Sequence, residues 1–416
     1  MNIEDIWLIL VLYAEILIAL IGGYYVLIYT LGLFPWKKRE IPKGKRYLKF
    51  AILIPAHDEE RVIANLVSNL NKLRYPRSCY EVIVIADNCT DNTAKVAKNA
   101  GATVWERKDS IRRGKQHALS WAFKRVLKMK RFDAVCVFDA DNLVSLNFLE
   151  KVNEMFCSGE KVVQCYLDTK NPFDSWVTKA YALGYWISNR VFQLARWHVG
   201  LSAVLGGTGF AIALDLVKKY ALNLTSVTED LELTVKLNLD GIKIGWIHDA
   251  KVYDEKPLTL RDSWNQRLRW MRGHWDVAWR YSLPLFKKAM LEGKLHVLDM
   301  FFYALSPLRV IVSGAVILFL CVSYLADIEV MDFKVYSVLP FEFWFVLSLW
   351  MWLYPLVAIF QERIPLKALP YIVYLFIWSL TWIPVVIQAL FSFREREWSH
   401  TRHTRSLTLE EIGQKV

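Results

Sequence analysis

The feature that most constrains this sequence is an apolar segment over residues 6–36, in which Glu15 is the one acidic residue. At a rise of about 1.5 Å per residue, about 20 residues suffice to cross the hydrocarbon core of a bilayer. The segment follows two acidic residues and has no small-residue cleavage site, unlike a signal peptide. We therefore expect residues 1–36 to be a retained transmembrane anchor, in which Glu15 either faces a polar path or lies near the outer surface.

Basic residues follow this anchor directly. They are Lys37, Lys38, Arg39, Lys43, Lys45, Arg46 and Lys49. By the positive-inside rule, that end of the anchor lies in the cytoplasm. Residues 37–285 have the composition of a soluble domain, so we expect this domain to be cytosolic. The six cysteines form no Cys-x-x-Cys pair, which is consistent with reduced cytosolic thiols.

Three further apolar segments, near 298–326, 339–361 and 368–393, are also long enough to cross a membrane. We therefore expect about three membrane helices within 286–394 and a basic tail over 395–416, in a multi-pass protein of the plasma membrane. Four crossings would put the C-terminus outside, whereas the arginines of the tail favour the cytoplasm, so parity and charge disagree. The net charge of +11 reflects these basic flanks, and we expect no nucleic acid as a partner.

Residues 50 to about 285 alternate short apolar runs with amphipathic stretches. The runs that predict buried strands are 50–55, 81–86, 102–105 and 134–138, and the stretches that predict helices include 60–73 and 114–127. This order is typical of an α/β domain with an open, mostly parallel sheet. Such sheets bind ligands beyond the carboxyl ends of their strands, which is where the sequence has His57, Glu59, Asp87, Asp139 and Asp141.

Two acidic motifs follow predicted strands. In Asp139-Ala140-Asp141, carboxylates at i and i+2 on a turn can face one Mg²⁺ or Mn²⁺, because hard cations favour oxygen ligands. Alternatively, Asp141-Asn142 turns the chain and caps the next helix. In Asp87-Asn88, the carboxylate can accept from a uracil N–H or a ribose hydroxyl, unless it forms an Asx turn. Each motif taken alone leaves both interpretations open.

Two further motifs open predicted helices. Arg112-Arg113-Gly114-Lys115 places cations beside the free N–H groups of a helix start, which suits a diphosphate, although a solvated basic turn has the same pattern. Thr228-Glu229-Asp230 begins a second helix. Ser226 and Glu229 have the spacing of a capping box, which would explain Glu229 and leave Asp230 free as a candidate general base.

The last motif is Gln266-Arg267-Leu268-Arg269-Trp270. Gln266, Arg269 and Trp270 have the spacing i, i+3, i+4, so they share one helical face. That face offers an amide, a guanidinium for phosphate and a flat ring for a sugar. An interfacial helix anchored to lipid by Trp and Arg would show the same residues, and both interpretations can hold at once.

The order of these motifs is more specific than any one of them. Asp-Asn, Gly-Lys, Asp-x-Asp, Gly-x-Gly-Phe, Thr-Glu-Asp and Gln-x-x-Arg-Trp follow one another through one domain, and apolar segments come after it. In this the chain resembles the membrane-bound family-2 glycosyltransferases, the group that includes the processive cellulose, chitin, hyaluronan and poly-N-acetylglucosamine synthases. The resemblance covers about residues 50–285 and implies a GT-A fold, that of the nucleotide-diphospho-sugar transferases.

The resemblance also implies roles for the residues quoted above. Asp230 would be the catalytic base, Asp139 and Asp141 would hold Mg²⁺ or Mn²⁺, and Glu229 and Trp270 would contact the acceptor. The nucleotide-sugar would be bound by Pro55, Ala56, His57, Glu59, Asp87, Arg113, Lys115, Asp139, Gln266 and Arg269. One departure is Asp87-Asn88, since the family usually has Asp-Asp or Asp-Gly at this place.

The implied reaction is the inverting transfer of a sugar from a UDP-sugar, with UDP-GlcNAc or UDP-Glc favoured. We expect the acceptor to be a growing β-linked polysaccharide, because Gln-x-x-Arg-Trp accompanies processive members. The alternative is a single transfer to a lipid or to a polyprenyl-phosphate-linked acceptor. A transporter or membrane scaffold with a degenerate domain is disfavoured, because every carboxylate that the chemistry needs is present. Membrane lipid, and a partner subunit or a second copy of the chain, are the other expected partners.

Overall fold

The computed structural model describes residues 3–34, 46–312, 314, 318, 339–364, 366–395 and 405–413. Several residues on which the sequence analysis relied lie outside these described parts of the chain. They are Lys37, Lys38, Arg39, Lys43, Lys45, Arg396 and Arg402, together with about half of the predicted span 298–326.

Eight strands form one sheet in the order β3-β2-β1-β4-β7-β6-β8-β5. Their bounds are β1 Phe50–Ala56, β2 Tyr80–Asp87, β3 Thr103–Arg107, β4 Ala134–Val137, β5 Leu143–Val144, β6 Val162–Thr169, β7 Phe210–Ala213 and β8 Gly245–Asp254. The four predicted strands are confirmed as β1 to β4, which pair in parallel. The sheet as a whole is mixed, because β7 pairs antiparallel with β4 and β6, and β5 pairs antiparallel with β8.

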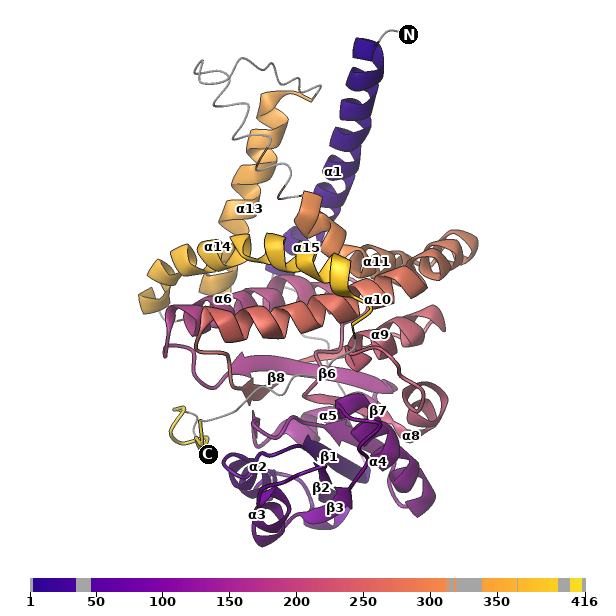
Figure 1. The fold of residues 1–416 in the computed structure, drawn as a ribbon, viewed down its shortest axis with the longest axis vertical. Helices are drawn as coiled ribbons and strands as arrows, with labels where there is room; N and C mark the ends of the chain where they lie inside the picture. The colour runs from indigo at the N-terminus through magenta and orange to yellow at the C-terminus, as the bar shows by residue number, and fades with distance from the viewer. Residues whose placement is uncertain are drawn as a thin grey trace.

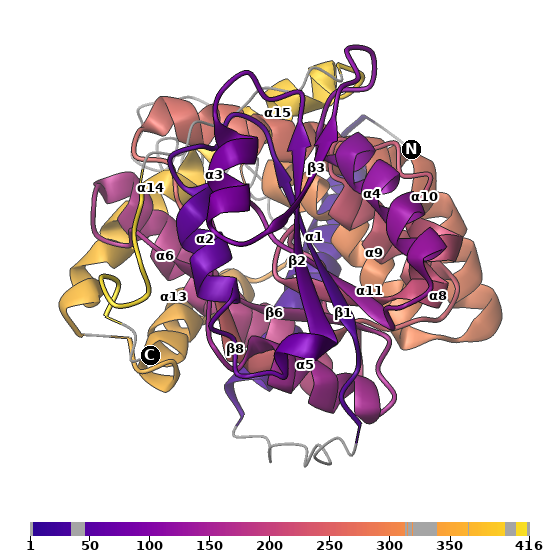
Figure 2. The same ribbon diagram turned by 90° about the horizontal axis from the view of Figure 1, so that it is seen from below.

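Helices cover both faces of this sheet, as the view from below shows (Figure 2). On one face lie α2 (Ile63–Leu70), α3 (Thr93–Asn99) and α5 (Phe148–Cys157), and on the other α4 (Lys115–Met129) and α9 (Glu229–Leu239). Successive side chains of β1 point to opposite faces, so Ile52 and Ile54 pack with the first group and Leu53 with the second. Burial of each of these side chains contributes about 1.5–3 kcal/mol to the stability of the fold. The strand, and with it the polar residues at its end, is therefore held in position.

A layer of helices lies above the sheet in Figure 1. Its members are α6 Trp176–Ser188, α10 Leu260–Glu292, α14 Ile372–Leu380 and α15 Trp382–Ser392. Helix α10 runs through the domain boundary predicted at residue 285. The fully buried Arg267 holds α10 in the layer, because its Nη1 donates to Thr381 Oγ1 at 2.8 Å and its guanidinium lies 4.9 Å from the ring centroid of Trp378.

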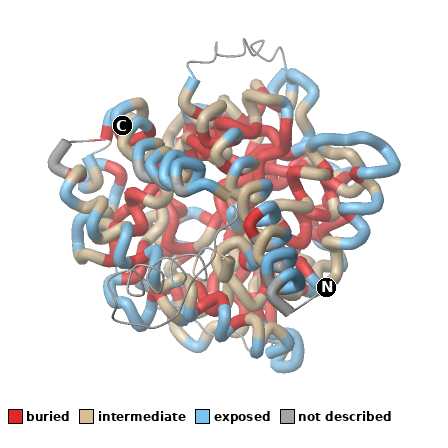
Figure 3. Tube along the Cα trace, turned by 90° about the horizontal axis from the view of Figure 1, so that it is seen from above, coloured by how far each residue is buried: buried red, intermediate tan, exposed pale blue. Residues whose placement is uncertain are grey.

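Helices α1 (Ile3–Leu33) and α13 (Phe341–Gln361) stand upright from this layer in Figure 1, with the N-terminus at the far end of α1. Glu15 in α1 is buried and accepts a hydrogen bond from the Leu339 N–H at 2.8 Å. Seen from above, buried segments gather in the middle of the molecule and exposed ones at its rim (Figure 3). The remaining elements are η1 Arg77–Cys79, η2 Asn189–Leu194, α7 Ala195–His198, α8 Leu214–Leu216, η3 Val217–Ala221, α11 Leu295–Ala304 and η4 Leu366–Tyr371.

Two stretches within the described residues are long and apolar enough to cross a membrane. They are Val11–Leu33, in α1, and Ala368–Ser392, which includes α14 and α15. The pair Leu295–Ala304 and Ser306–Val312, bent by 53° between its halves, would be a third if it formed one span. The predicted spans 6–36 and 368–393 thus correspond, in length and composition, to the stretches Val11–Leu33 and Ala368–Ser392.

Candidate active site

The polar strand ends and the layer of helices enclose a cleft of about 1020 Å³. It is lined by every residue to which the sequence analysis gave a binding or catalytic role. These are Pro55, Ala56, His57, Glu59, Asp87, Arg113, Lys115, Asp139, Asp141, Glu229, Asp230, Gln266, Arg269 and Trp270. Residues more than 200 positions apart in the sequence therefore meet in one place, although their roles stay predictions.

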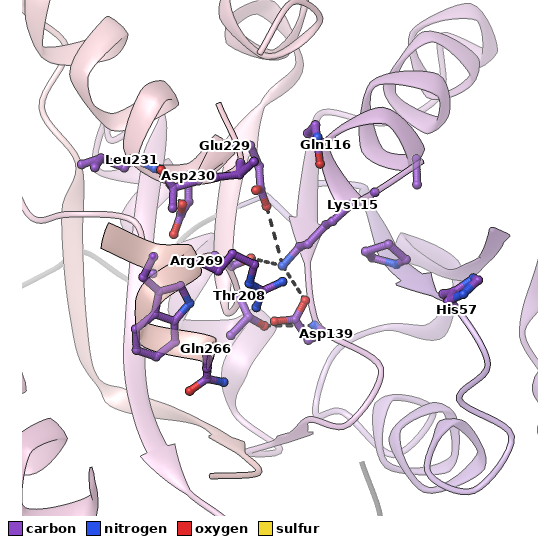
Figure 4. A pocket seen from close by; sticks show the side chains of 18 of the residues that line it. His57, Lys115, Gln116, Asp139, Thr208, Glu229, Asp230, Leu231, Gln266 and Arg269 are labelled. Carbon is purple, nitrogen blue, oxygen red and sulfur yellow. Dashed lines mark hydrogen bonds and ion pairs between the residues drawn. The ribbon is translucent and has the colours of Figure 1, made fainter. Parts of the chain in front are cut away.

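Lys115, the first residue of α4, lies at the centre of the cleft (Figure 4). Its ammonium donates to the Asp139 carboxylate and, at 2.8 Å, to the carbonyl of Gly207, and it lies 3.8 Å from Glu229 Oε1. Burial alone would lower the pKa of Lys115, but the charges of Asp139 and Glu229 outweigh it and raise that pKa. The lysine is therefore a fixed cation in the place where the charge of a diphosphate leaving group would need one.

Glu229 and Asp230 open α9 beside Lys115. Burial raises the pKa of the Glu229 carboxyl to about 7 against the opposing effect of Lys115, and burial likewise raises the pKa of Asp230. The Asp230 carboxylate accepts from the Leu231 N–H at 2.8 Å and also borders Gly207, where an added Cβ would lie 3.3 Å from Asp230 Oδ2. A carboxylate with a raised pKa is suited to accept a proton near neutral pH.

The capping box predicted from Ser226 and Glu229 is not formed. Helix α9 begins at Glu229 itself, with Thr228 at the N-cap and no side-chain capping bond. Ser226 Oγ instead accepts from the Thr228 N–H at 3.4 Å, so the turn before the helix uses this hydroxyl. The helix starts two residues later than a cap at Ser226 requires, because its N-cap is Thr228, and this leaves Glu229 available to pair with Lys115.

Asp139 and Asp141 lie on the turn after β4. The Asp139 N–H donates to Thr208 Oγ1 and to Asn142 Oδ1, both at 3.1 Å, so the Gly-x-Gly-Phe segment helps to shape this turn. The Asp139 side chain is 38% exposed, and Asp141 Oδ2 accepts from the Glu255 N–H at 2.9 Å. Two carboxylates at this spacing, completed by diphosphate and water oxygens, form a ligand set that fits Mg²⁺ or Mn²⁺.

Another acidic group in the described residues has the spacing of metal ligands, but its oxygens already serve the backbone. The ligand atoms of Asp58, Cys89 and Asp91 lie within 4.8 Å of one another. Asp58 Oδ1 accepts from the Thr90 N–H at 2.7 Å, and Asp91 Oδ1 accepts from the Thr93 N–H at 2.9 Å. These bonds are those of turns that precede α3, and neither Asp58, Cys89 nor Asp91 lines the cleft, so we assign no metal to this group.

At the far end of the cleft, Asp87 ends β2 and pairs with Arg107 at 2.5 Å. Burial raises the pKa of Asp87, and Arg107 opposes that effect. His57 Nδ1 lies 2.7 Å from the Asp87 carbonyl oxygen, and the buried Glu59 donates its N–H to Thr93 Oγ1 at 2.8 Å. In Figure 4, His57 and Asp230 lie on opposite sides of Lys115.

Helix α10 roofs the cleft with the predicted face of Gln266, Arg269 and Trp270. Gln266 Oε1 accepts from the Tyr181 hydroxyl at 3.0 Å, and the Trp270 ring packs edge-on against Tyr181 with centroids 6.4 Å apart. The roof can approach α9 closely because of Gly273, where an added Cβ would lie 2.3 Å from Thr228 Oγ1.

Sequence reasoning missed several residues of the cleft wall. Among them are Tyr185 on α6, Asp254 at the end of β8, His274 on α10 and Tyr303 on α11. Asp254 could have been found, because it ends a strand as Asp87 does; burial raises its pKa to about 6, and Lys256 opposes that effect. His274 could have been found too, because it lies one turn beyond Trp270 on α10, whereas α6 and α11 dock on the domain without a local sequence signal.

Comparison with known proteins decides the family. Residues 48–273, more than half of the chain, match the family described as glycosyltransferase like family 2. The chain belongs to this family. It is therefore a glycosyltransferase, and its mixed sheet with flanking helices is the GT-A fold. The solved structure of the mannosyltransferase PcManGT from Pyrobaculum calidifontis, in complex with GDP-Man and Mn²⁺, matches with a TM-score of 0.59 over 93% of this chain and 100% of that one, at 15% identity. At that identity, the likeness supports the fold alone.

Three curated relatives are similar to part of the chain. The probable glycosyltransferase YdaM of Bacillus subtilis is 28% identical over 300 residues, which is 67% of this chain and 69% of that protein. The beta-monoglucosyldiacylglycerol synthase of Nostoc sp. is 32% identical over 270 residues, 62% of this chain and 55% of that protein. The poly-beta-1,6-N-acetyl-D-glucosamine synthase of Staphylococcus aureus is 26% identical over 242 residues, 55% of each chain. This chain thus spans about half the length of the last two.

Proposed function

We propose that this glycosyltransferase moves a hexosyl group from a UDP-sugar, with inversion, to a hydroxyl group of a membrane lipid. One observation carries the reaction type: Lys115, Asp139, Glu229 and Asp230 converge in one cleft under Arg269 of α10. The cleft wall includes Tyr303 of α11, which belongs to the bent apolar pair, and an apolar helix in the wall suits an acceptor with a lipid tail. The 32% identical Nostoc relative is named for a lipid acceptor, which supports the same choice.

In this proposal the chain's own residues perform most of the work. Asp230 takes the proton from the acceptor hydroxyl as its oxygen attacks the anomeric carbon, and general-base catalysis of this kind typically contributes about 10²–10⁴-fold. Lys115 and Arg269 stabilise the charge that develops on the departing diphosphate. Asp87 and the Pro55-Ala56-His57 turn hold the nucleoside. A divalent cation held by Asp139 and Asp141 would supply Lewis-acid neutralisation of the diphosphate. A single displacement inverts the anomeric centre, so an α-linked donor gives a β-linked product.

A growing β-linked polysaccharide is the second candidate acceptor. It is favoured by Trp270, which lines the cleft next to Gln266 and Arg269 and offers a flat ring that tolerates any newly added sugar unit. A polymerase needs such holding because its product is its next acceptor. The relative from Staphylococcus aureus is named for such a polymer.

We propose further that the domain 37–285 is cytosolic and that three segments cross the membrane. Helices α14 and α15 pack along α6 and α10 rather than standing upright beside α1 and α13 (Figure 1), so Ala368–Ser392 would lie along the membrane surface. Crossings by α1, by the apolar segment that the sequence predicts near 298–326 and by α13 would then leave the tail on the side of the domain. The docking of Arg405 on Asp174, at 2.8 Å, supports that arrangement. The number of membrane crossings and the positive charge of the tail then both place the C-terminus on the cytosolic side.

The test uses purified protein in lipid vesicles with Mg²⁺ or Mn²⁺ and a panel of UDP- and GDP-sugars. We expect UDP release with one UDP-hexose, and a glycolipid that carries one sugar. Long products that grow with time would replace the lipid acceptor with the polysaccharide. Release of nucleoside diphosphate from GDP-sugars only would refute the UDP assignment, and no release from any donor would refute the proposed reaction.

A further inference from the structure

The C-terminal segment 405–413 follows the apolar helices but lies against the catalytic domain, as Figure 1 shows near the C-terminus. Leu409 is buried against Leu143 and Tyr253, which belong to the paired strands β5 and β8. Asn65 on α2 donates from its side-chain amide to the Leu407 carbonyl at 3.1 Å. These contacts attach the segment to the sheet edge beside the cleft.

Arg405, at the start of this segment, makes three polar contacts with the domain. Its guanidinium lies 2.8 Å from the Asp174 carboxylate, its N–H donates to Glu255 Oε2 at 3.1 Å, and its carbonyl accepts from Lys170 Nζ at 3.0 Å. Two of these three are made by the Arg405 backbone, so they depend on where the segment runs rather than on its side chain.

Lys170 and Glu255 both reach Asp141, the second carboxylate of the candidate metal pair. Lys170 Nζ donates to the Asp141 carbonyl at 2.7 Å, and the Glu255 N–H donates to Asp141 Oδ2 at 2.9 Å. Lys170 is 4% exposed, and a buried ammonium is costly unless its hydrogen bonds are satisfied. The carbonyls of Asp141 and Arg405 both accept from this ammonium, so loss of one changes how the other is held.

We propose that segment 405–413 is a strap that fixes Asp141, through Lys170 and Glu255, in the geometry in which it binds the divalent cation. Lys170 is then a positioning residue, and Asp141 is the residue that it positions. Hydrogen-bond partners of metal ligands typically account for about 10–100-fold in metal affinity. The proposal rests on the proposed function, because it assumes that Asp139 and Asp141 hold a cation.

The test measures Mn²⁺ binding directly, by electron paramagnetic resonance in the presence of UDP, so it does not depend on turnover. The variants are a chain that stops after Thr404 and Lys170→Met. The control is Lys161→Met, which removes an exposed lysine that pairs with Asp215 at 2.6 Å, away from the cleft. We expect the truncated chain and Lys170→Met to bind Mn²⁺ about 10–100-fold more weakly, and the control to bind as wild type does.

Two further measurements separate positioning from folding. A synthetic peptide of residues 405–416, added to the truncated chain, should restore Mn²⁺ affinity. The truncated chain should still unfold in one cooperative thermal transition in EDTA, because loss of the buried Leu409 costs only about 1.5–3 kcal/mol. If Lys170→Met does not fold, the truncated chain and its peptide decide. Unchanged Mn²⁺ affinity in the truncated chain would overturn the strap while leaving the proposed function intact. Absence of Mn²⁺ binding in wild type would instead overturn the metal role, and the strap with it.

Discussion

Gly273 in α10 offers a direct test of how the roof of the cleft is positioned. A Cβ at this place would lie 2.3, 2.5 and 2.8 Å from Thr228 Oγ1, Cγ2 and Cβ, well inside van der Waals contact. Thr228 is the N-cap of α9, the helix that carries Asp230 in its first turn. Substitution of Gly273 by Ala therefore pushes the Gln-x-x-Arg-Trp face and the candidate base apart.

Two opposing effects set the magnitude for Gly273→Ala. Alanine gains about 1 kcal/mol over glycine in a helix interior. Overpacking a tight contact costs about 1–3 kcal/mol. The net change in unfolding free energy is therefore between about zero and 2 kcal/mol, whereas catalytic groups misplaced by about 1 Å can cost about 10²-fold. We expect turnover to fall about 10–100-fold, with a change of only a few degrees in melting temperature.

The assay is UDP release at saturating donor, together with thermal unfolding. Thr228→Gly removes all three clashing atoms, so the double variant Gly273→Ala/Thr228→Gly should be more active than the product of the two single effects predicts. The matched control is Gly184→Ala on α6, where the nearest atom to an added Cβ is Leu375 Cδ1 at 3.6 Å, an ordinary contact. Full turnover in Gly273→Ala, or additive effects in the double variant, would refute the reasoning.

Four other outcomes follow from the site. Asp230→Asn should lower turnover by about 10²–10⁴-fold while UDP binding persists in calorimetry; near-normal turnover would place the base elsewhere. Excess EDTA should abolish UDP release, and full activity in EDTA would remove the metal. Because the pKa of Glu229 is raised from 4.5 to about 7 in the folded chain, its ionisation destabilises the fold, so stability should fall as pH rises between these values. In Glu229→Gln that fall should be smaller, as thermal unfolding at several pH values would show. If the polysaccharide is the acceptor, Trp270→Ala should shorten products on a sizing gel more than it weakens UDP binding.

The first half of the sheet could be predicted because each strand is a continuous apolar run between turn residues. Phe50–Ala56 and Tyr80–Asp87 are buried on both faces, so their composition alone marks them as strands. The second half carries less signal. Strand β5 has two residues, too few for any periodicity, and the antiparallel pairing of β5 and β7 depends on how the intervening helices pack.

The site was predictable to the extent that it lies at strand ends and helix starts. Such places are occupied by Asp87, Asp139 and Lys115. Charged side chains at the carboxyl ends of strands and at helix starts are typical of ligand-binding sites. Tyr185 and Tyr303 were not predictable, because aromatic residues on apolar helices are equally compatible with a lipid contact. Their place in the cleft wall follows from the docking of α6 and α11 on the domain.

Helix α10 links the chemistry to the apolar part of the chain. Arg269 and Trp270 face the cleft. Arg267, two residues before Arg269 on the same helix, is instead buried against Thr381, which lies between α14 and α15. A helix is rigid over so short a distance, so any shift of α14 and α15 moves the face of α10 that roofs the cleft. If the strap holds Asp141 as proposed, the chain beyond α15 is attached to the floor of the same cleft. The roof and the floor of the cleft would then both be attached to the helices that are proposed to lie at the membrane. A lipid acceptor could in that case reach Asp230 while its apolar part stays in the membrane.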